Sequence, residues 1–136
     1  MQDLKEVIKP FYNALLTANS GADVQHVMKT LLADNFQNIN TAHTLTKEDF
    51  KTHVPGLFQM IPNMKCEIQE ILQEGNKVVV RSIISGNPVG NFFGIQCNGS
   101  KAFKVMAIDL HTIENNQIVS VHHLEEWTTA FQQLQS

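Results

Sequence analysis

Residues 103–127, FKVMAIDLHTIENNQIVSVHHLEEW, decide how this chain folds. Two runs rich in Val, Ile, Leu and Phe flank the polar pair Asn115-Asn116, and asparagine tolerates the left-handed backbone of a tight turn. The stretch therefore predicts a β-hairpin whose arms are residues 103–113 and 118–127.

The alternation of side chains along a strand also predicts which residues of this hairpin share a face. One face carries titratable groups on an apolar wall, namely Val105, Ala107, Asp109, His111, Ile118, Ser120, His122, Leu124 and Glu126. The other face carries Met106, Ile108, Leu110, Val119, Val121, His123, Glu125 and Trp127. With Asn115-Asn116 as the turn, Asp109 is expected to face His122.

Helical spacing of apolar residues dominates the first part of the chain. Residues 4–18 predict a first helix, which Pro10 either kinks or starts. Asp23 is a suitable N-cap for a second helix. A third helix is expected to start at Lys47, behind a capping box, and to be divided at Pro55-Gly56.

The periodicity changes to that of strands at Met64. Residues 64–73 and 77–85 predict a second hairpin, the glycine-rich residues 86–99 are expected to wrap around an edge, and residues 128–134 predict a short helix. Helices followed by strands indicate an α+β fold in which N-terminal helices pack on a curved antiparallel sheet.

Composition limits the classes of protein to consider. The 136 residues, 43% of them hydrophobic, predict a single domain over residues 1–136. A net charge of −3 with scattered Lys and Arg offers no basic surface for nucleic acid. No apolar run approaches the ~18 residues of a membrane span, and the first residues lack the pattern of a signal peptide. We expect a cytoplasmic protein that binds neither nucleic acid nor membrane, with Cys66 and Cys97 as free thiols.

Five stretches of the chain, residues 61–64, 74–81, 86–101, 109–119 and 126–134, are similar to a known family in their order and spacing. The chain resembles the SnoaL-like polyketide cyclase, or ester cyclase, branch of the nuclear transport factor two superfamily. The resemblance implies a cone-shaped α+β fold, a cavity for a hydrophobic small-molecule ligand, and a homodimer. It further implies cofactor-free proton-transfer chemistry, such as cyclisation or isomerisation of a hydrophobic carbonyl compound.

In this family an aspartate at the end of the last strand is the acid/base residue, and the resemblance places Glu126 at that position. Glu126, His122 and Asp109 are therefore the candidate catalytic residues, because a buried carboxylate beside a histidine suits proton abstraction next to a carbonyl. The alternative is a buried Asp109–His122 pair with Glu126 in solvent, in a binding or dimerisation module without catalysis. No zinc spacing is present, so we do not expect a metal, and the family resemblance implies that no cofactor is needed.

The expected substrate-binding residues combine polar groups with apolar cavity lining: Arg81, His111, Val105, Leu124, Phe11, Phe58 and Phe92. Arg81 could instead pair with Glu70, which lies on the same strand face. The hairpin face that carries Met106, Ile108, Leu110, Val119 and Val121 is too apolar to remain in water, so we expect it to mediate the homodimer.

Overall fold

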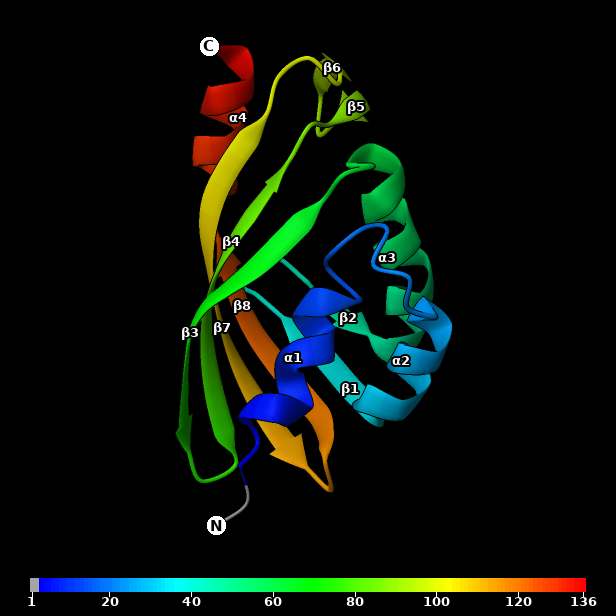
Figure 1. Cartoon of the computed structure of the whole chain (residues 1–136), viewed down its shortest axis with the longest axis vertical. Helices are drawn as coiled ribbons and strands as arrows, with labels where there is room; N and C mark the ends of the chain where they lie inside the picture. Colours follow the sequence, from blue (N-terminus) through cyan, green and yellow to red (C-terminus); the bar gives the residue numbers. More distant parts are fainter. Residues whose placement is uncertain (1–2) are drawn as a thin grey trace.

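The structure of the chain, a computed structural model, describes residues 3–136, so residues 1 and 2 of the expected domain lie outside the described residues. Helices precede most of the strands, which confirms the predicted α+β class (Figure 1). The helices are α1 (Lys5–Asn13), α2 (Val24–Leu31), α3 (Lys47–Met60) and α4 (Trp127–Gln135). The strands are β1 (Leu32–Ile39), β2 (Thr44–Thr46), β3 (Lys65–Glu74), β4 (Lys77–Gly86), β5 (Val89–Phe92), β6 (Ile95–Asn98), β7 (Phe103–Glu114) and β8 (Gln117–Glu125).

A six-stranded sheet in the order β2-β1-β8-β7-β4-β3 forms the frame of the molecule, and β5 and β6 form a separate small hairpin. The neighbouring strands run antiparallel except for β1 and β8, which run parallel. The sheet is therefore mixed and mostly antiparallel, and the expectation of a wholly antiparallel sheet is corrected at this pair. No short turn joins β1 to β8, so local sequence does not fix their relative direction.

Helices α1, α2 and α3 cover the inner face of the curved sheet, and α4 packs against β7 (Figure 1). The core between these layers contains large side chains with little or no exposed surface, including Ile8, Leu15, Phe36, Phe50 and Ile61. In residues 3–136 no helix is both long enough and apolar enough to cross a membrane. Cys66 and Cys97 are free thiols, as predicted.

Local signals set the starts of the helices. Asp23 caps α2 by accepting a hydrogen bond from the backbone of His26, and Thr46 and Asp49 form both bonds of the predicted capping box. Pro10 lies inside α1, so it does not start that helix.

The expected division of the third helix is wrong, because α3 continues through Pro55. The buried side chains of Val54 and Leu57 stand on either side of this proline. Burial of the apolar face along both halves of the helix offsets the cost of an interior proline, about 3 kcal/mol.

The hairpin of β7 and β8 forms where the sequence predicts it, with positive φ angles of 52° and 61° at Asn115 and Asn116. Beyond the turn the pairing changes. Ile113 pairs with Ile118, but Thr112 pairs with Ser120, so Val119 is an extra residue in β8. This is a β-bulge, in which two residues of one strand oppose one residue of its partner.

The bulge reverses the faces predicted for β8. Asp109 pairs with His123, and the prediction that it faces His122 is wrong. Beyond the bulge Val121 is buried, whereas His122 and Leu124 are exposed. In β7 the predicted alternation is confirmed, since every second residue from Phe103 to Ile113 is buried.

Candidate functional site

A cavity of about 390 Å³ lies between the inner face of the sheet and the helices. Its wall is mostly apolar, and five aromatic residues contribute to it: Phe11, Phe50, Phe93, Trp127 and Phe131. Its polar lining side chains include Asn38, Asn40, His43, His53, Ser82, Asp109, His123 and Glu125. A largely apolar hollow with a few convergent polar groups is typical of a small-molecule site.

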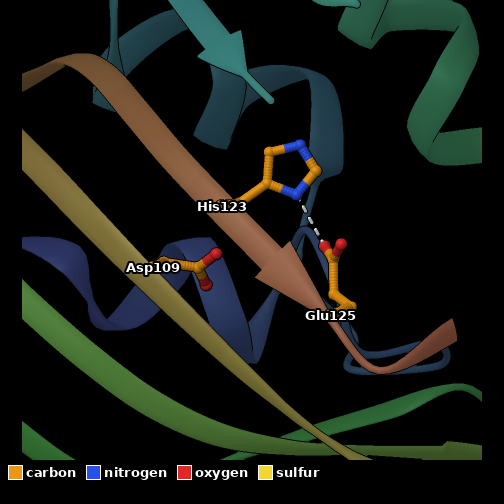
Figure 2. Close-up of side chains that lie close together, drawn as sticks. All are labelled: Asp109, His123 and Glu125. Atoms are coloured by element: carbon orange, nitrogen blue, oxygen red, sulfur yellow. Dashed lines mark hydrogen bonds and ion pairs between the residues drawn. The ribbon is translucent and has the colours of Figure 1, made fainter. Parts of the chain in front are cut away.

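Three of these polar side chains lie together on the inner face of β7 and β8 (Figure 2). One donor or acceptor atom from each of Asp109, His123 and Glu125 lies within 4.8 Å of the other two. His123 Nδ1 and Glu125 Oε1 are 2.8 Å apart, and Asn40 Nδ2 lies 3.3 Å from His123 Nε2. The cluster thus joins two carboxyl groups and an imidazole that has a partner at each ring nitrogen.

A second set of contacts reaches Asp109 from the buried side, away from the cavity. The Tyr12 hydroxyl of α1 lies 2.7 Å from Asp109 Oδ2 and 2.7 Å from His111 Nε2. Tyr12 and His111 are fully buried, and Asp109 is 4% exposed. Alternation along β7 places Asp109 and His111 on one face, so a single tyrosine can reach both.

Burial and neighbouring charges set the protonation of these groups. Burial, reinforced by the negative charge of Glu125, raises the pKa of Asp109 to about 7, against the opposing effects of the Tyr12 hydrogen bond and of His123. Burial alone lowers the pKa of His111 to about 3 and is the main reason that the pKa of Tyr12 is well above its usual value. For His123, burial acts to lower the pKa, but the hydrogen bond and charge of Glu125 outweigh it and raise the pKa. Near pH 7, Asp109 can therefore both take up and release a proton, while His111 is neutral.

The candidate catalytic residues of the sequence analysis are only partly brought together. Asp109 lines the cavity as expected. His122 and Glu126 do not line it, because the bulge turns His122 outward and the strand ends before Glu126. Glu126 precedes α4 and accepts a hydrogen bond from the backbone of Met106 at 2.9 Å.

Of the expected substrate-binding residues, Phe11 alone is in the cavity wall. The outward-facing Arg81 pairs with Glu70 at 2.8 Å, which confirms the alternative stated for it. His111 is buried behind the cavity against Tyr12. The others are corrected as follows: Val105 and Phe92 belong to the core, Phe58 packs against the core, and Leu124 is 74% exposed because of the bulge.

Sequence reasoning missed Tyr12, His123 and Glu125. His123 and Glu125 belong to the stretch singled out as decisive, but strict alternation assigned them to the outer face. Tyr12 is four residues after Ile8, which is the helical spacing of a buried face, and this spacing could have identified it as buried. Nothing local indicates its contact with a residue 97 positions later.

Asp109, His123 and Glu125 offer the mixed nitrogen and oxygen donors that could hold a divalent cation. In the described structure His123 Nδ1 is bonded to Glu125 and Asp109 Oδ2 to Tyr12. These bonds satisfy two of the donor atoms without a metal. The same arrangement of two carboxyl groups and an imidazole also suits proton transfer.

An α+β fold with helices over a curved, mostly antiparallel sheet is that of the nuclear transport factor two-like class, and here it encloses an apolar cavity with a carboxyl group on its wall. The chain belongs to the SnoaL-like polyketide cyclase family, whose pattern matches residues 6–134. The resemblance seen in the sequence is thereby confirmed. No curated protein matches the chain.

Solved structures with the same fold share little sequence with this chain. A candidate SnoaL-like polyketide cyclase from Jannaschia sp. CCS1 is 18% identical, with a TM-score of 0.85 over 100% of this chain and 99% of that chain. IdmH, a candidate polyketide cyclase from Streptomyces antibioticus, is 19% identical, with a TM-score of 0.82 over 99% and 100%. A Catenulispora acidiphila DSM 44928 protein with a ketosteroid isomerase-like fold, solved in complex with trimethylamine, is 17% identical, with a TM-score of 0.77 over 96% and 93%. At these identities the likeness shows the fold alone.

Proposed function

We propose that this protein catalyses cofactor-free proton transfer on a hydrophobic carbonyl compound, such as the cyclisation or isomerisation of a polyketide-like substrate. The observation that carries the proposal is the carboxyl group of Asp109. It is 4% exposed, lies in the wall of an apolar cavity, and has a pKa of about 7 because of its burial. A buried acid that ionises near neutral pH suits general acid–base chemistry.

In this mechanism Asp109 takes a proton from the carbon next to the carbonyl group, and the electron pair moves onto the carbonyl oxygen. Two groups are available to stabilise the resulting enolate: the second amide hydrogen of Asn40, and His123 in its protonated form, which Glu125 favours by raising its pKa and in which Nε2 carries a hydrogen to donate. In an isomerisation, Asp109 returns the proton to another carbon. In a cyclisation, the enolate carbon attacks a second carbonyl group, and Asp109 gives its proton to the alkoxide that forms.

Two further observations support a small-molecule reaction. The cavity wall contains neither Lys nor Arg within residues 3–136, so it suits an apolar substrate better than an anionic one. Two relatives of the same fold carry the name of candidate polyketide cyclases, and a third was solved with trimethylamine bound.

The test is to replace Asp109 and Glu126 separately by their amides and to measure turnover on hydrophobic ketones, lactones and steroid enones. Asp109→Asn should lower kcat by about 10²–10⁴-fold and leave ligand affinity within a few fold. The amide keeps the shape of the side chain but cannot take up or release a proton near neutral pH. Glu126→Gln is the matched control and should retain activity. The reverse order of effects would return the role to Glu126, the position inferred from the family resemblance.

The alternative function is a binding module that has kept the cavity without the chemistry. Full activity of Asp109→Asn on a verified substrate would refute the role of Asp109. Tight binding of a cavity ligand by the wild type, with no turnover across the substrate screen, would favour the binding module.

We also propose that two copies of the chain associate through the outer face of the sheet. Leu72, Ile108, Leu110 and Leu124 are 62%, 45%, 36% and 74% exposed there. Ile108 pairs with Leu124 across β7 and β8, so two of these side chains are direct neighbours. An apolar patch that spans several strands fits self-association, and a two-fold axis would bring the same patch of both copies together.

A further inference from the structure

We infer that Tyr12 and His111 are positioning residues for Asp109: His111 donates to the Tyr12 hydroxyl, which must then donate to Asp109 and hold its carboxyl group against the cavity wall. The inference rests on the proposed function for its catalytic meaning, but its geometry does not depend on any substrate. Neither Tyr12 nor His111 lines the cavity, so their effect on the chemistry passes through Asp109.

The first step of the argument is a count of hydrogens. The Tyr12 oxygen lies 2.7 Å from both Asp109 Oδ2 and His111 Nε2, and both distances are those of hydrogen bonds. A phenol has one hydrogen to donate, and an ionised carboxylate can only accept. If Tyr12 donates to Asp109, the other contact is a hydrogen bond only when His111 Nε2 carries a hydrogen.

The surroundings of His111 make this assignment consistent. His111 is 0% exposed, and the ring of Phe11 packs edge-on against it at 5.1 Å. Burial keeps the imidazole neutral, so that one of its two nitrogens carries a hydrogen and the other does not.

The second nitrogen of His111 supplies an independent observation. His111 Nδ1 is buried and has no hydrogen-bond partner among the described residues. A buried N–H group without a partner is rarer in proteins than a buried acceptor without one. The bare nitrogen is therefore expected at Nδ1 and the hydrogen at Nε2, where Tyr12 accepts it.

The consequence for Asp109 follows from all the groups that face it. Tyr12 approaches from α1, His123 and Glu125 from β8, and Cys66 from β3. Tyr12 and His123 favour the ionised carboxylate, while burial and the charge of Glu125 disfavour it. Removing the Tyr12 hydroxyl takes away one contact that stabilises the ionised form. The pKa of the Asp109 carboxyl group therefore rises, and the group is held less firmly in its orientation.

The inference is tested on the folded protein without any substrate. Nitrogen NMR of the wild type at pH 9, where Asp109 is ionised, should show neutral His111 with hydrogen on Nε2. Carbon NMR of the Asp109 carboxyl group should show its pKa rise by about one unit or more in Tyr12→Phe. Ser82→Ala, which removes another buried hydroxyl with no bond to Asp109, is the matched control and should leave that pKa within about 0.3 units.

Hydrogen on Nδ1 of His111 would overturn the inference, and so would an unchanged Asp109 pKa in folded Tyr12→Phe. If Tyr12→Phe does not fold, the wild-type tautomer still decides. If a substrate is found, the acid side of the pH–rate profile should move to higher pH in Tyr12→Phe. Failure to find turnover would count against the proposed function and would leave the NMR results standing.

Discussion

Two histidines and two glutamates lie in and just beyond the last residues of β8, and one residue of each type lines the cavity while the other does not. His123 and Glu125 face the cavity, bond to each other at 2.8 Å, and expose 12% and 17% of their side chains. His122 and Glu126 are exposed and lie outside the cavity. A shift of one residue along the chain therefore separates a partly buried, bonded histidine and carboxylate from a histidine and a carboxylate that are exposed.

The comparison shows that residues of the same type differ in protonation and bonding because their surroundings differ. The apolar wall of the inner face excludes water, so the stability of each charged group there depends on its few neighbours. On the outer face water screens the same groups. Experiments that alter one face at a time can test this difference.

The largest expected effect is on stability, from Asp109→Asn. The pKa of Asp109 is raised to about 7 by folding, so the wild type loses stability as pH rises from about 4 to 7. The amide does not ionise, and the variant should be more stable than the wild type at pH 8 by about 2–4 kcal/mol. Urea denaturation at pH 8 and pH 4 measures this, and the difference should vanish at pH 4.

His111 makes stability depend on pH in the direction opposite to Asp109. Its pKa falls to about 3 on folding, so its contribution to stability rises with pH between about 3 and 6.5. In the wild type this rise opposes the loss from Asp109. Asp109→Asn should expose it as stability that increases with pH over that window, and a flat curve would contradict the burial assigned to His111.

The next effect concerns the outer face. Ile108→Glu places a charge in the exposed apolar patch and should weaken the proposed dimer by about 100-fold or more, because a carboxylate resists burial. Sedimentation velocity over a range of concentrations measures the association. Gln59→Glu, which adds the same charge on the exposed surface of α3, is the control. A monomeric wild type at micromolar concentration would refute the dimer itself.

The smallest expected effect is on turnover, and it distinguishes His123 from His122. His123→Asn should lower turnover by about 10–100-fold, since it removes a donor near the reacting group and the partner of Glu125. His122→Asn should stay within about threefold of the wild type, as expected for a solvated position. Equal losses in the two variants would mean that the cavity is not where the chemistry happens.

Much of the frame could be predicted from local sequence. The capping box before α3, the Asn115-Asn116 turn and the alternation of β7 are each set by neighbouring residues, and each was predicted correctly. The parallel pairing of β1 with β8 was not, because it joins segments about 80 residues apart without a short turn.

The site was harder to predict because it depends on the bulge at Val119. Nothing in the residues around Val119 distinguishes it from a regular strand. On the other side of β8, the pairing with β1 also shifts, between the pairs Leu32–Ile118 and Gln37–Ser120. The irregularity thus involves three strands, and a reading of β8 alone cannot locate it.

The bulge also makes the lining of the cavity respond differently to a deletion and to an insertion in β8. Deleting Val119 would restore regular pairing while keeping Val121, His123 and Glu125 inward. Inserting one residue after Ser120 would instead present His122, Leu124 and Glu126 to the cavity. In evolution or in the laboratory, a single codon gained in this strand exchanges the whole set of side chains offered to a ligand, a change that point substitutions would need several steps to achieve.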